Sequence, residues 1–152
     1  MALLAVAFLS LLPVANASRS STGTGSFTAT STTMNVRSAG PNTVIDSQSS
    51  FTATGFFTGT CVGTTRSVGR SNGQSTAHGS CTFTGTIGDK SGTLVFRLEF
   101  TGVGASFQGR FVGVQGSGGL AGVHVSGTFQ GMATGMTTSA GTYSASARFS
   151  SS

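Results

Sequence analysis

The chain has 152 residues, enough for one domain, and it is poor in charge: 7% of the residues are Asp, Glu, Lys or Arg, and the net charge is +5. The eight basic residues are scattered singly, whereas nucleic-acid-binding proteins cluster such residues on one face beside stacking aromatics, so we expect no nucleic-acid partner. Twelve phenylalanines and 37% hydrophobic residues favour a folded chain over a disordered one, despite the many Gly, Ser and Thr.

Residues 1–17 have the pattern of a secretory signal peptide. The apolar stretch from Ala2 to Leu12 is too short to span a bilayer, and Ala15-Asn16-Ala17 forms an A-x-A cleavage site before Ser18. No Lys or Arg precedes this stretch, and a buried N-terminal strand or helix is the alternative. We therefore expect a secreted protein, periplasmic or extracellular, with no membrane span, a flexible segment over 18–25 and one domain over 26–150.

Apolar or small residues alternate with Thr, Ser and charged residues through most of this domain, which is typical of antiparallel strands with one buried face. Short Gly-rich turn signals separate the alternating segments, and such short connections require antiparallel neighbours. About eight strands can close into a barrel without free edges, so the prediction is an all-β, single closed antiparallel barrel, with a two-sheet β-sandwich as the alternative. The expected strands lie within 26–31, 43–48, 51–61, 77–87, 93–101, 107–113, 121–129 and 143–149.

The parity of the alternation predicts which side chains lie inside the barrel. Register slips of one residue would bury charges and expose aromatic rings, so the parity is strongly specified. The outward set includes Thr52, Thr82, Arg97 and Glu99. Rings that meet glycines on neighbouring strands would fill the barrel, so we expect a filled interior or a small pocket. The inward phenylalanines, which are also the candidate ligand-lining residues, are Phe57, Phe83, Phe96, Phe111 and Phe129.

One hairpin, with its turn at Val103-Gly104, illustrates the packing. A register consistent with the parity places Phe96 opposite Phe111, Leu98 opposite Gly109 and Phe100 opposite Phe107, and a register two residues away is the alternative. Glu99 then lies diagonal to Arg110 on the polar face. The candidate polar cluster is Arg97, Glu99 and Arg110, whose value as a surface ion pair is small and whose other role is a binding patch.

The two cysteines, Cys61 and Cys81, are equidistant from Ser71 at the centre of a predicted hairpin. A symmetric hairpin places them directly opposite each other, close enough for a disulfide in an oxidising compartment. His78 and His124 have the opposite parity and cannot join the cysteines, so we expect no metal site.

No sequence motif predicts catalysis. Residues 69–73 spell G-x-S-x-G and residues 116–121 spell G-x-G-x-x-A, but both fall in turns between strands without the helix that either motif needs. The three acids, Asp46, Asp89 and Glu99, are far apart in sequence, so no carboxylate pair is expected. We predict no catalytic residues and no cofactor.

Several motifs after Gly79 are shared with a known family. They are Phe83-Thr84-Gly85, Ser91-Gly92-Thr93, the run of residues 114–122 (VQGSGGLAG) and Gly127-Thr128-Phe129. Through them the C-terminal half resembles the bacterial domain-of-unknown-function family 3224, which is grouped with allene oxide cyclase-like barrels. The resemblance implies an eight-stranded antiparallel barrel and no particular activity. No residues match the catalytic carboxylate region of allene oxide cyclases or the Asp/Arg sites of dirigent proteins.

Two functional hypotheses follow. The first is a non-enzymatic secreted barrel that binds a small apolar or carbohydrate ligand, or a cell-envelope surface. The second is a cyclase or isomerase-like enzyme that orients a substrate in the barrel cavity, which rests on analogy of fold alone. A polar group pointing into the cavity would favour the second hypothesis. The sequence predicts no oligomeric state.

Overall fold

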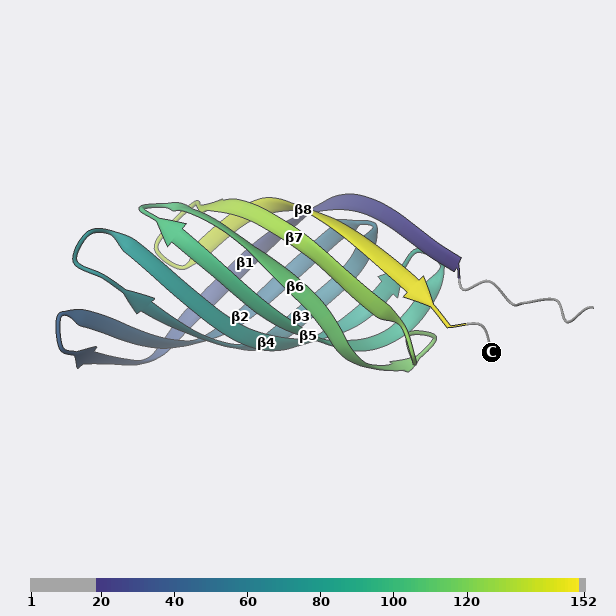
Figure 1. Cartoon of the computed structure of the whole chain (residues 1–152), viewed down its shortest axis with the longest axis horizontal. Helices are drawn as coiled ribbons and strands as arrows, with labels where there is room; N and C mark the ends of the chain where they lie inside the picture. The colour runs from purple at the N-terminus through teal and green to yellow at the C-terminus, as the bar shows by residue number, and fades with distance from the viewer. Residues whose placement is uncertain (1–18, 151–152) are drawn as a thin grey trace, which may run out of the picture.

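The computed structural model describes residues 19–150, which form eight antiparallel strands joined by short turns. Each strand pairs with the next, and β8 pairs with β1, so the sheet closes into a barrel (Figure 1). The predicted barrel is therefore confirmed, and the sandwich alternative is wrong. The signal-peptide prediction for residues 1–17 lies outside the described residues, as does Ser18. The strands are β1 (Arg19–Ala39), β2 (Asn42–Gly55), β3 (Phe57–Gly69), β4 (Gln74–Ile87), β5 (Lys90–Val103), β6 (Ser106–Gly118), β7 (His124–Ala133) and β8 (Thr138–Phe149).

Two predicted boundaries differ from the structure. Residues 19–25, expected to be flexible, belong to β1 and pair with β8 from Arg19 opposite Phe149, because closing the barrel requires β1 to run the length of β8. The segment 51–61, expected as one strand, is divided between β2 and β3. Gly55, with a φ of 96°, adopts a conformation that side chains disfavour, and Phe56 forms the bend that reverses the chain.

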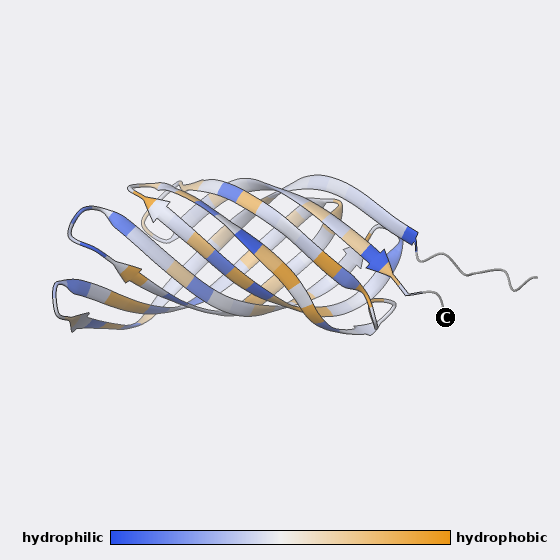
Figure 2. Cartoon of the chain, in the orientation of Figure 1, coloured by the Kyte–Doolittle hydropathy of each residue, from blue (hydrophilic) through white to orange (hydrophobic). Residues whose placement is uncertain are grey.

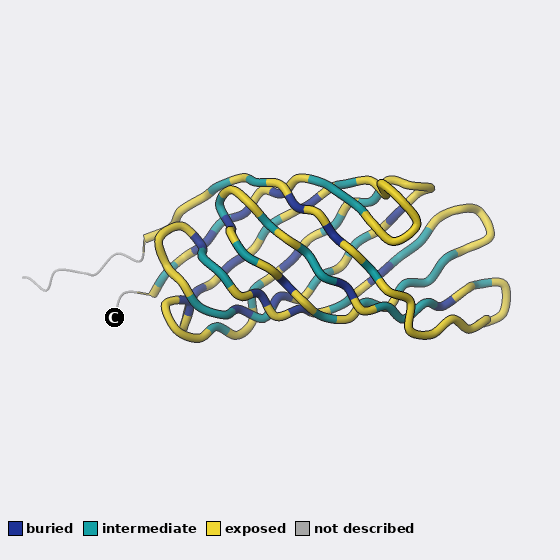
Figure 3. The backbone as a smooth tube through the Cα atoms, turned by 180° about the vertical axis from the view of Figure 1, so that it is seen from behind, coloured by how far each residue is buried: buried dark blue, intermediate teal, exposed yellow. Residues whose placement is uncertain are grey.

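The alternation positions the side chains as the sequence predicts. Apolar and polar positions alternate along the strands in Figure 2, and buried and exposed positions alternate in the same way in Figure 3. Thr52, Thr82, Arg97 and Glu99 are exposed. Buried inside the barrel are Phe57, Phe83, Phe96, Phe111 and Phe129.

Two-residue turns determine several registers. The pairs Gly40-Pro41, Gly88-Asp89 and Gly104-Ala105 each place a glycine of positive φ first and a residue without positive φ second, which is the type II′ pattern of tight hairpins. Because the glycine must come first, the β5–β6 turn is Gly104-Ala105 and not Val103-Gly104. The register is thus the alternative two residues away. It pairs Phe96 with Gly113, Leu98 with Phe111, Glu99 with Arg110 and Phe100 with Gly109.

The β3–β4 hairpin carries the predicted disulfide, which joins Cys61 and Cys81 with a Cα–Cα distance of 5.5 Å. The cysteines were expected to lie directly opposite each other, but they are diagonal: Cys61 pairs with Phe83, and Cys81 pairs with Gly63. The loop is centred on Asn72, whose Oδ1 accepts a hydrogen bond from the Gln74 amide at 3.1 Å, and this shifts the register by two residues.

The interior is filled by aromatic rings lying over glycines, as the alternation suggested. Four inward glycines each lie under an aromatic ring. A Cβ atom added at any of them would overlap that ring, so glycine is required for this packing. The paired residues, each directly opposite in register, are Phe27 with Gly141, Phe107 with Gly131, Phe111 with Gly127 and Tyr143 with Gly25.

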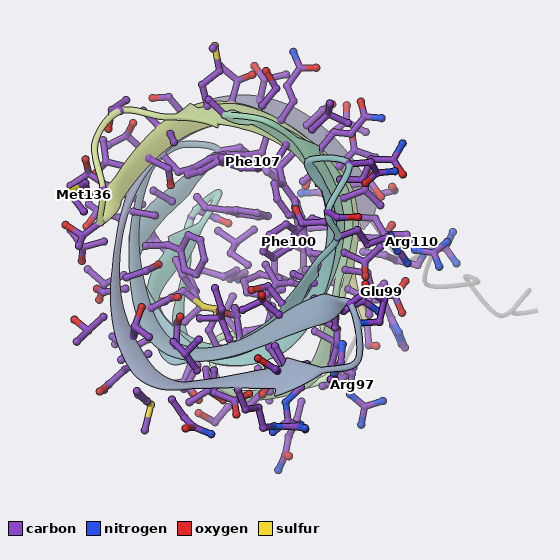
Figure 4. All side chains as sticks on the ribbon, turned by 90° about the vertical axis from the view of Figure 1, so that its left-hand side faces the viewer. Arg97, Glu99, Phe100, Phe107, Arg110 and Met136 are labelled. Atoms are coloured by element: carbon purple, nitrogen blue, oxygen red, sulfur yellow. A yellow bond between two sulfur atoms is a disulfide. The ribbon has the colours of Figure 1, made fainter. Side chains whose placement is uncertain are left out.

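The barrel has two dissimilar ends. At the end that carries Arg19 and Phe149, here called the closed end, residues 119–122 form turns and not the start of the predicted strand 121–129. Leu120 in this segment is completely buried and covers the interior. At the opposite end, here called the open end, lie the tips of the β1–β2, β3–β4, β5–β6 and β7–β8 hairpins (Figure 1). Figure 4, viewed from the open end, looks past these tips to Phe100 and Phe107.

Candidate functional site

The barrel interior contains a small cavity of about 80 Å³, far below the roughly 300–1,000 Å³ of a typical small-molecule site. It is lined by aromatic rings, Ala53, Leu98 and the Cys61–Cys81 disulfide. The five phenylalanines proposed as ligand-lining residues surround this cavity, and their rings pack against one another at centroid distances of 5.4–6.3 Å. Their observed contacts are those of core residues.

Tyr143 is the one polar side chain among the residues that line this cavity. Its hydroxyl accepts a hydrogen bond from the Phe57 amide at 2.7 Å and donates to the Thr54 carbonyl at 2.8 Å. Burial raises the pKa of Tyr143, and the hydrogen bond with the Phe57 backbone partly offsets this effect. The neutral hydroxyl therefore links β8 to the turn between β2 and β3, and both of these hydrogen bonds are made with backbone groups.

The outer face carries a row of four charged side chains and one histidine, here called the charged row, in which each residue lies directly opposite the next on the adjacent strand. Arg66 binds Asp46 with two hydrogen bonds of 2.6 and 3.0 Å, and these bonds are the main cause of the lowered pKa of Asp46. Arg110 donates two hydrogen bonds of 3.0 and 2.7 Å to one oxygen of Glu99. In strand order the charged row is Asp46, Arg66, His78, Glu99 and Arg110.

A second row runs parallel to the first, two residues closer to the open end on β4 and β5; it is called the amide row here. Gln108 on β6 lies directly opposite Gln130 on β7, so two planar amides stand side by side. Hydroxyl side chains continue the row on the other strands. They are Thr76, Thr101, Thr142, Ser26 and Thr54.

An open groove of about 1240 Å³ lies between the two rows. One wall is made by His78, Glu99 and Arg110 of the charged row, and the other by the amide row. Inward-facing residues between the rows, such as Ala77 and Gly109, contribute backbone to the floor. The groove crosses the strands, and from His78 on β4 to β7 it spans three inter-strand steps, roughly 14 Å.

The structure brings only part of the predicted polar cluster together. Glu99 and Arg110 form an ion pair in the groove wall. They were expected to be diagonal but lie directly opposite each other. Arg97 is exposed on the same face but lies opposite Val112, because the register differs by two residues from the expected one, and it does not line the groove. Figure 4 shows all three side chains pointing outward.

The groove residues His78, Gln108 and Gln130 were not predicted from the sequence. Parity places all three on the outer face, but only the register shows that His78 meets Glu99 and that the two glutamines meet each other. Within residues 19–150, no group of three or more His, Cys, Asp or Glu side chains is arranged to hold a metal ion. No helix in this part of the chain is long and apolar enough to cross a membrane.

Comparison with known proteins identifies the fold. No family model matches the sequence, and no curated protein matches it. A solved structure does: that of a protein of unknown function from the DUF3224 family of Shewanella oneidensis MR-1, with a TM-score of 0.69 and 17% sequence identity. The match covers 88% of this chain and 100% of the other. The chain has the fold of a DUF3224 barrel. At this level of identity the similarity to DUF3224 concerns the fold, and the groove must be interpreted from its own residues.

Proposed function

We propose that this DUF3224-like barrel is an exported, non-enzymatic protein that binds a carbohydrate of the cell envelope or its surroundings in the outer groove. The signal-peptide pattern of residues 1–17 and the disulfide support export, since disulfides persist in oxidising compartments. A disulfide-bonded β fold is compatible with an extracytoplasmic location. The observation that carries the binding proposal is the juxtaposition of the Glu99–Arg110 pair with the Gln108–Gln130 pair across one groove.

The chemistry of the groove suits a ligand rich in hydroxyl groups. Glu99 accepts hydrogen bonds, Arg110 donates them, and the amides of Gln108 and Gln130 do both. Sugar hydroxyls also donate and accept, so each wall offers partners for neighbouring hydroxyls. The elongated shape across several strands fits an oligosaccharide better than a compact molecule.

The Glu99–Arg110 ion pair is available to a ligand. Its two side chains are 64% and 75% exposed, and an ion pair in water contributes little to folding stability. A ligand can therefore take over hydrogen bonds from either partner without destabilising the barrel. The small interior cavity, by contrast, is lined by apolar side chains and by Tyr143, whose hydroxyl is hydrogen-bonded to backbone groups, so its described lining does not favour a cyclase or isomerase.

Binding can be tested on an array of bacterial and plant oligosaccharides, followed by calorimetric titration with the glycans retained. The double variant Gln108→Ala/Gln130→Ala should bind about tenfold more weakly, because it removes two hydrogen-bonding amides from the groove wall. Gln115→Ala is the matched control, since Gln115 is exposed on β6 but does not line the groove. Failure to retain any glycan, or an equal loss in the Gln115→Ala variant, would contradict the proposal.

A further inference from the structure

Exposed apolar side chains gather at the open end of the barrel. Among residues 19–150, eight large apolar side chains are exposed, and five of them lie on the hairpin tips of this end or on the strand segments beside them. Met136, in the turn between β7 and β8, is fully exposed, and the other four are at least 56% exposed. The five residues, here called the apolar rim, are Met34, Val36, Val103, Met132 and Met136.

Backbone hydrogen bonds hold several of these tips together. The Gly104 amide donates to the Gly73 carbonyl at 3.2 Å, and the Ala133 amide donates to the Ala105 carbonyl at 2.8 Å. The Ser31 amide of β1 donates to the Thr137 carbonyl at 2.8 Å. These bonds join the β3–β4, β5–β6 and β7–β8 tips to one another and connect the β7–β8 turn to β1, so much of the apolar rim lies on turns that are linked at the barrel mouth.

Positive charge accompanies the apolar rim. Arg37 lies on β1 beside Val36, and Arg70 follows the end of β3 next to the β5–β6 tip. The neighbouring Asp46 forms its ion pair with Arg66 and is also close enough to Arg37 for that charge to lower its pKa. The three arginines and one aspartate leave this end with a net positive charge.

We propose that the open end docks on the surface of an anionic lipid bilayer, with the apolar rim entering the interface and Arg37 and Arg70 contacting the headgroups. Apolar side chains beside basic ones are the combination that holds proteins at anionic membrane surfaces. Methionine side chains are flexible and adapt to irregular surroundings. The tips project to different heights in Figure 1, with β1–β2 projecting furthest. A fluid bilayer accommodates such an uneven ring, whereas a protein partner would need a matching shape.

The absence of tryptophan from the chain permits a local test. In the single variant Met136→Trp, fluorescence should shift to shorter wavelength when vesicles of equal parts phosphatidylglycerol and phosphatidylcholine are added, because the indole enters the bilayer. Val62→Trp is the matched control, since Val62 is also exposed but lies on the barrel wall. Its spectrum should not change. Pure phosphatidylcholine vesicles should bind the protein much more weakly.

Co-sedimentation with the same vesicles quantifies each contribution. Arg37→Gln and Arg70→Gln should each weaken binding about fivefold, as expected for the loss of one basic side chain near an anionic surface. Met132→Ser/Met136→Ser should weaken it about tenfold, and Val62→Ser/Val112→Ser should not. Absence of binding to anionic vesicles would overturn the proposal, as would equal losses in the control variants. A concentration-dependent dimer that dissociates when Met132 and Met136 are replaced would overturn it in favour of self-association.

Discussion

At the closed end of the barrel the completely buried inward side chains are apolar, whereas towards the open end several inward positions carry hydroxyl groups. Ile87, Leu94 and Leu120 have no exposed surface. Towards the open end, the Ser49 side chain is also buried, and its Oγ lies 3.0 Å from Ser31 Oγ and 3.4 Å from Thr65 Oγ1. The same period-two alternation therefore supports an apolar core in one half and a hydroxyl-lined wall in the other.

The difference shows that alternation determines which side chains point inward, whereas access to water determines whether those side chains are apolar or carry hydroxyl groups. A hydroxyl buried without a partner is destabilising, but neighbouring hydroxyls can satisfy one another. At the closed end the completely buried side chains under Leu120 are apolar and need no such partners. The open end combines hydroxyls, half-buried Phe100 and Phe107 and the exposed apolar rim. Stability should therefore reside mainly in the closed half, and binding in the open half and the outer face.

The largest expected effect is at the closed end. Leu120→Ala should lower the free energy of unfolding by about 2–5 kcal/mol, the usual range for a buried leucine, because the turn has no other side chain to fill the space. Met136→Ala at the open end should change it by no more than about 0.5 kcal/mol, since Met136 is fully exposed. Urea unfolding of both variants measures the contrast. Equal losses would show that the two ends contribute alike.

The second-largest effect on the free energy of unfolding is expected from removal of the disulfide. The double variant Cys61→Ala/Cys81→Ala should lose about 3 kcal/mol, because the bridge closes a loop between residues 20 apart and limits the unfolded chain. Unfolding under non-reducing conditions compares the variant with the wild type. Wild-type protein treated with reductant serves as the control and should unfold like the variant. A variant as stable as the oxidised wild type would mean that the closed half needs no covalent support.

The sequence predicted the direction of side chains better than their partners. Strict alternation around Phe83 and Phe96 identifies the buried face, because a slip of one residue would expose rings and bury charge. Slips of two residues preserve parity, so composition cannot exclude them. This is why the disulfide was predicted but its diagonal geometry was not. For the same reason Glu99 was predicted to lie diagonal to Arg110, in a β5–β6 register two residues from the observed one.

The groove could not be predicted for the same reason. Its walls depend on which outward residues meet across strands. Gln108 meets Gln130 only in the observed β6–β7 register, and Glu99 meets Arg110 only in the β5–β6 register that the Gly104-Ala105 turn establishes. Leu120 was missed for a different reason: it lies in a turn, where parity carries no information. The type II′ preference for glycine in the first turn position is the one sequence signal that could have corrected the β5–β6 register.

Tyr143→Phe should have an intermediate effect on the closed half. It leaves the Phe57 amide without its buried acceptor and should lower the free energy of unfolding by about 1–3 kcal/mol.

The pKa of Tyr143 is higher in the folded protein than in the unfolded chain. The contribution of Tyr143 to stability is therefore fully present below the unfolded pKa and is lost as pH rises through the folded pKa. Above about pH 10, wild-type stability should fall with pH. The chain has one tyrosine, so absorbance titration assigns the transition without ambiguity. A similar alkaline loss in Tyr143→Phe would assign it to other groups.

The smallest effect on stability is expected at the Glu99–Arg110 pair, on the outer face towards the open end. Both side chains remain largely in water, where the attraction between charges is weak and offset by the entropy of holding two long side chains. Glu99→Gln keeps the shape of the side chain, removes its charge and should change the free energy of unfolding by well under 1 kcal/mol. Its glycan affinity should nevertheless fall, because the carboxylate is a stronger hydrogen-bond acceptor than the amide. Thermal unfolding and calorimetric titration of the same sample separate these quantities. A large loss of stability would show that the pair helps to hold β5 to β6, and unchanged affinity would remove Glu99 from the proposed binding groove.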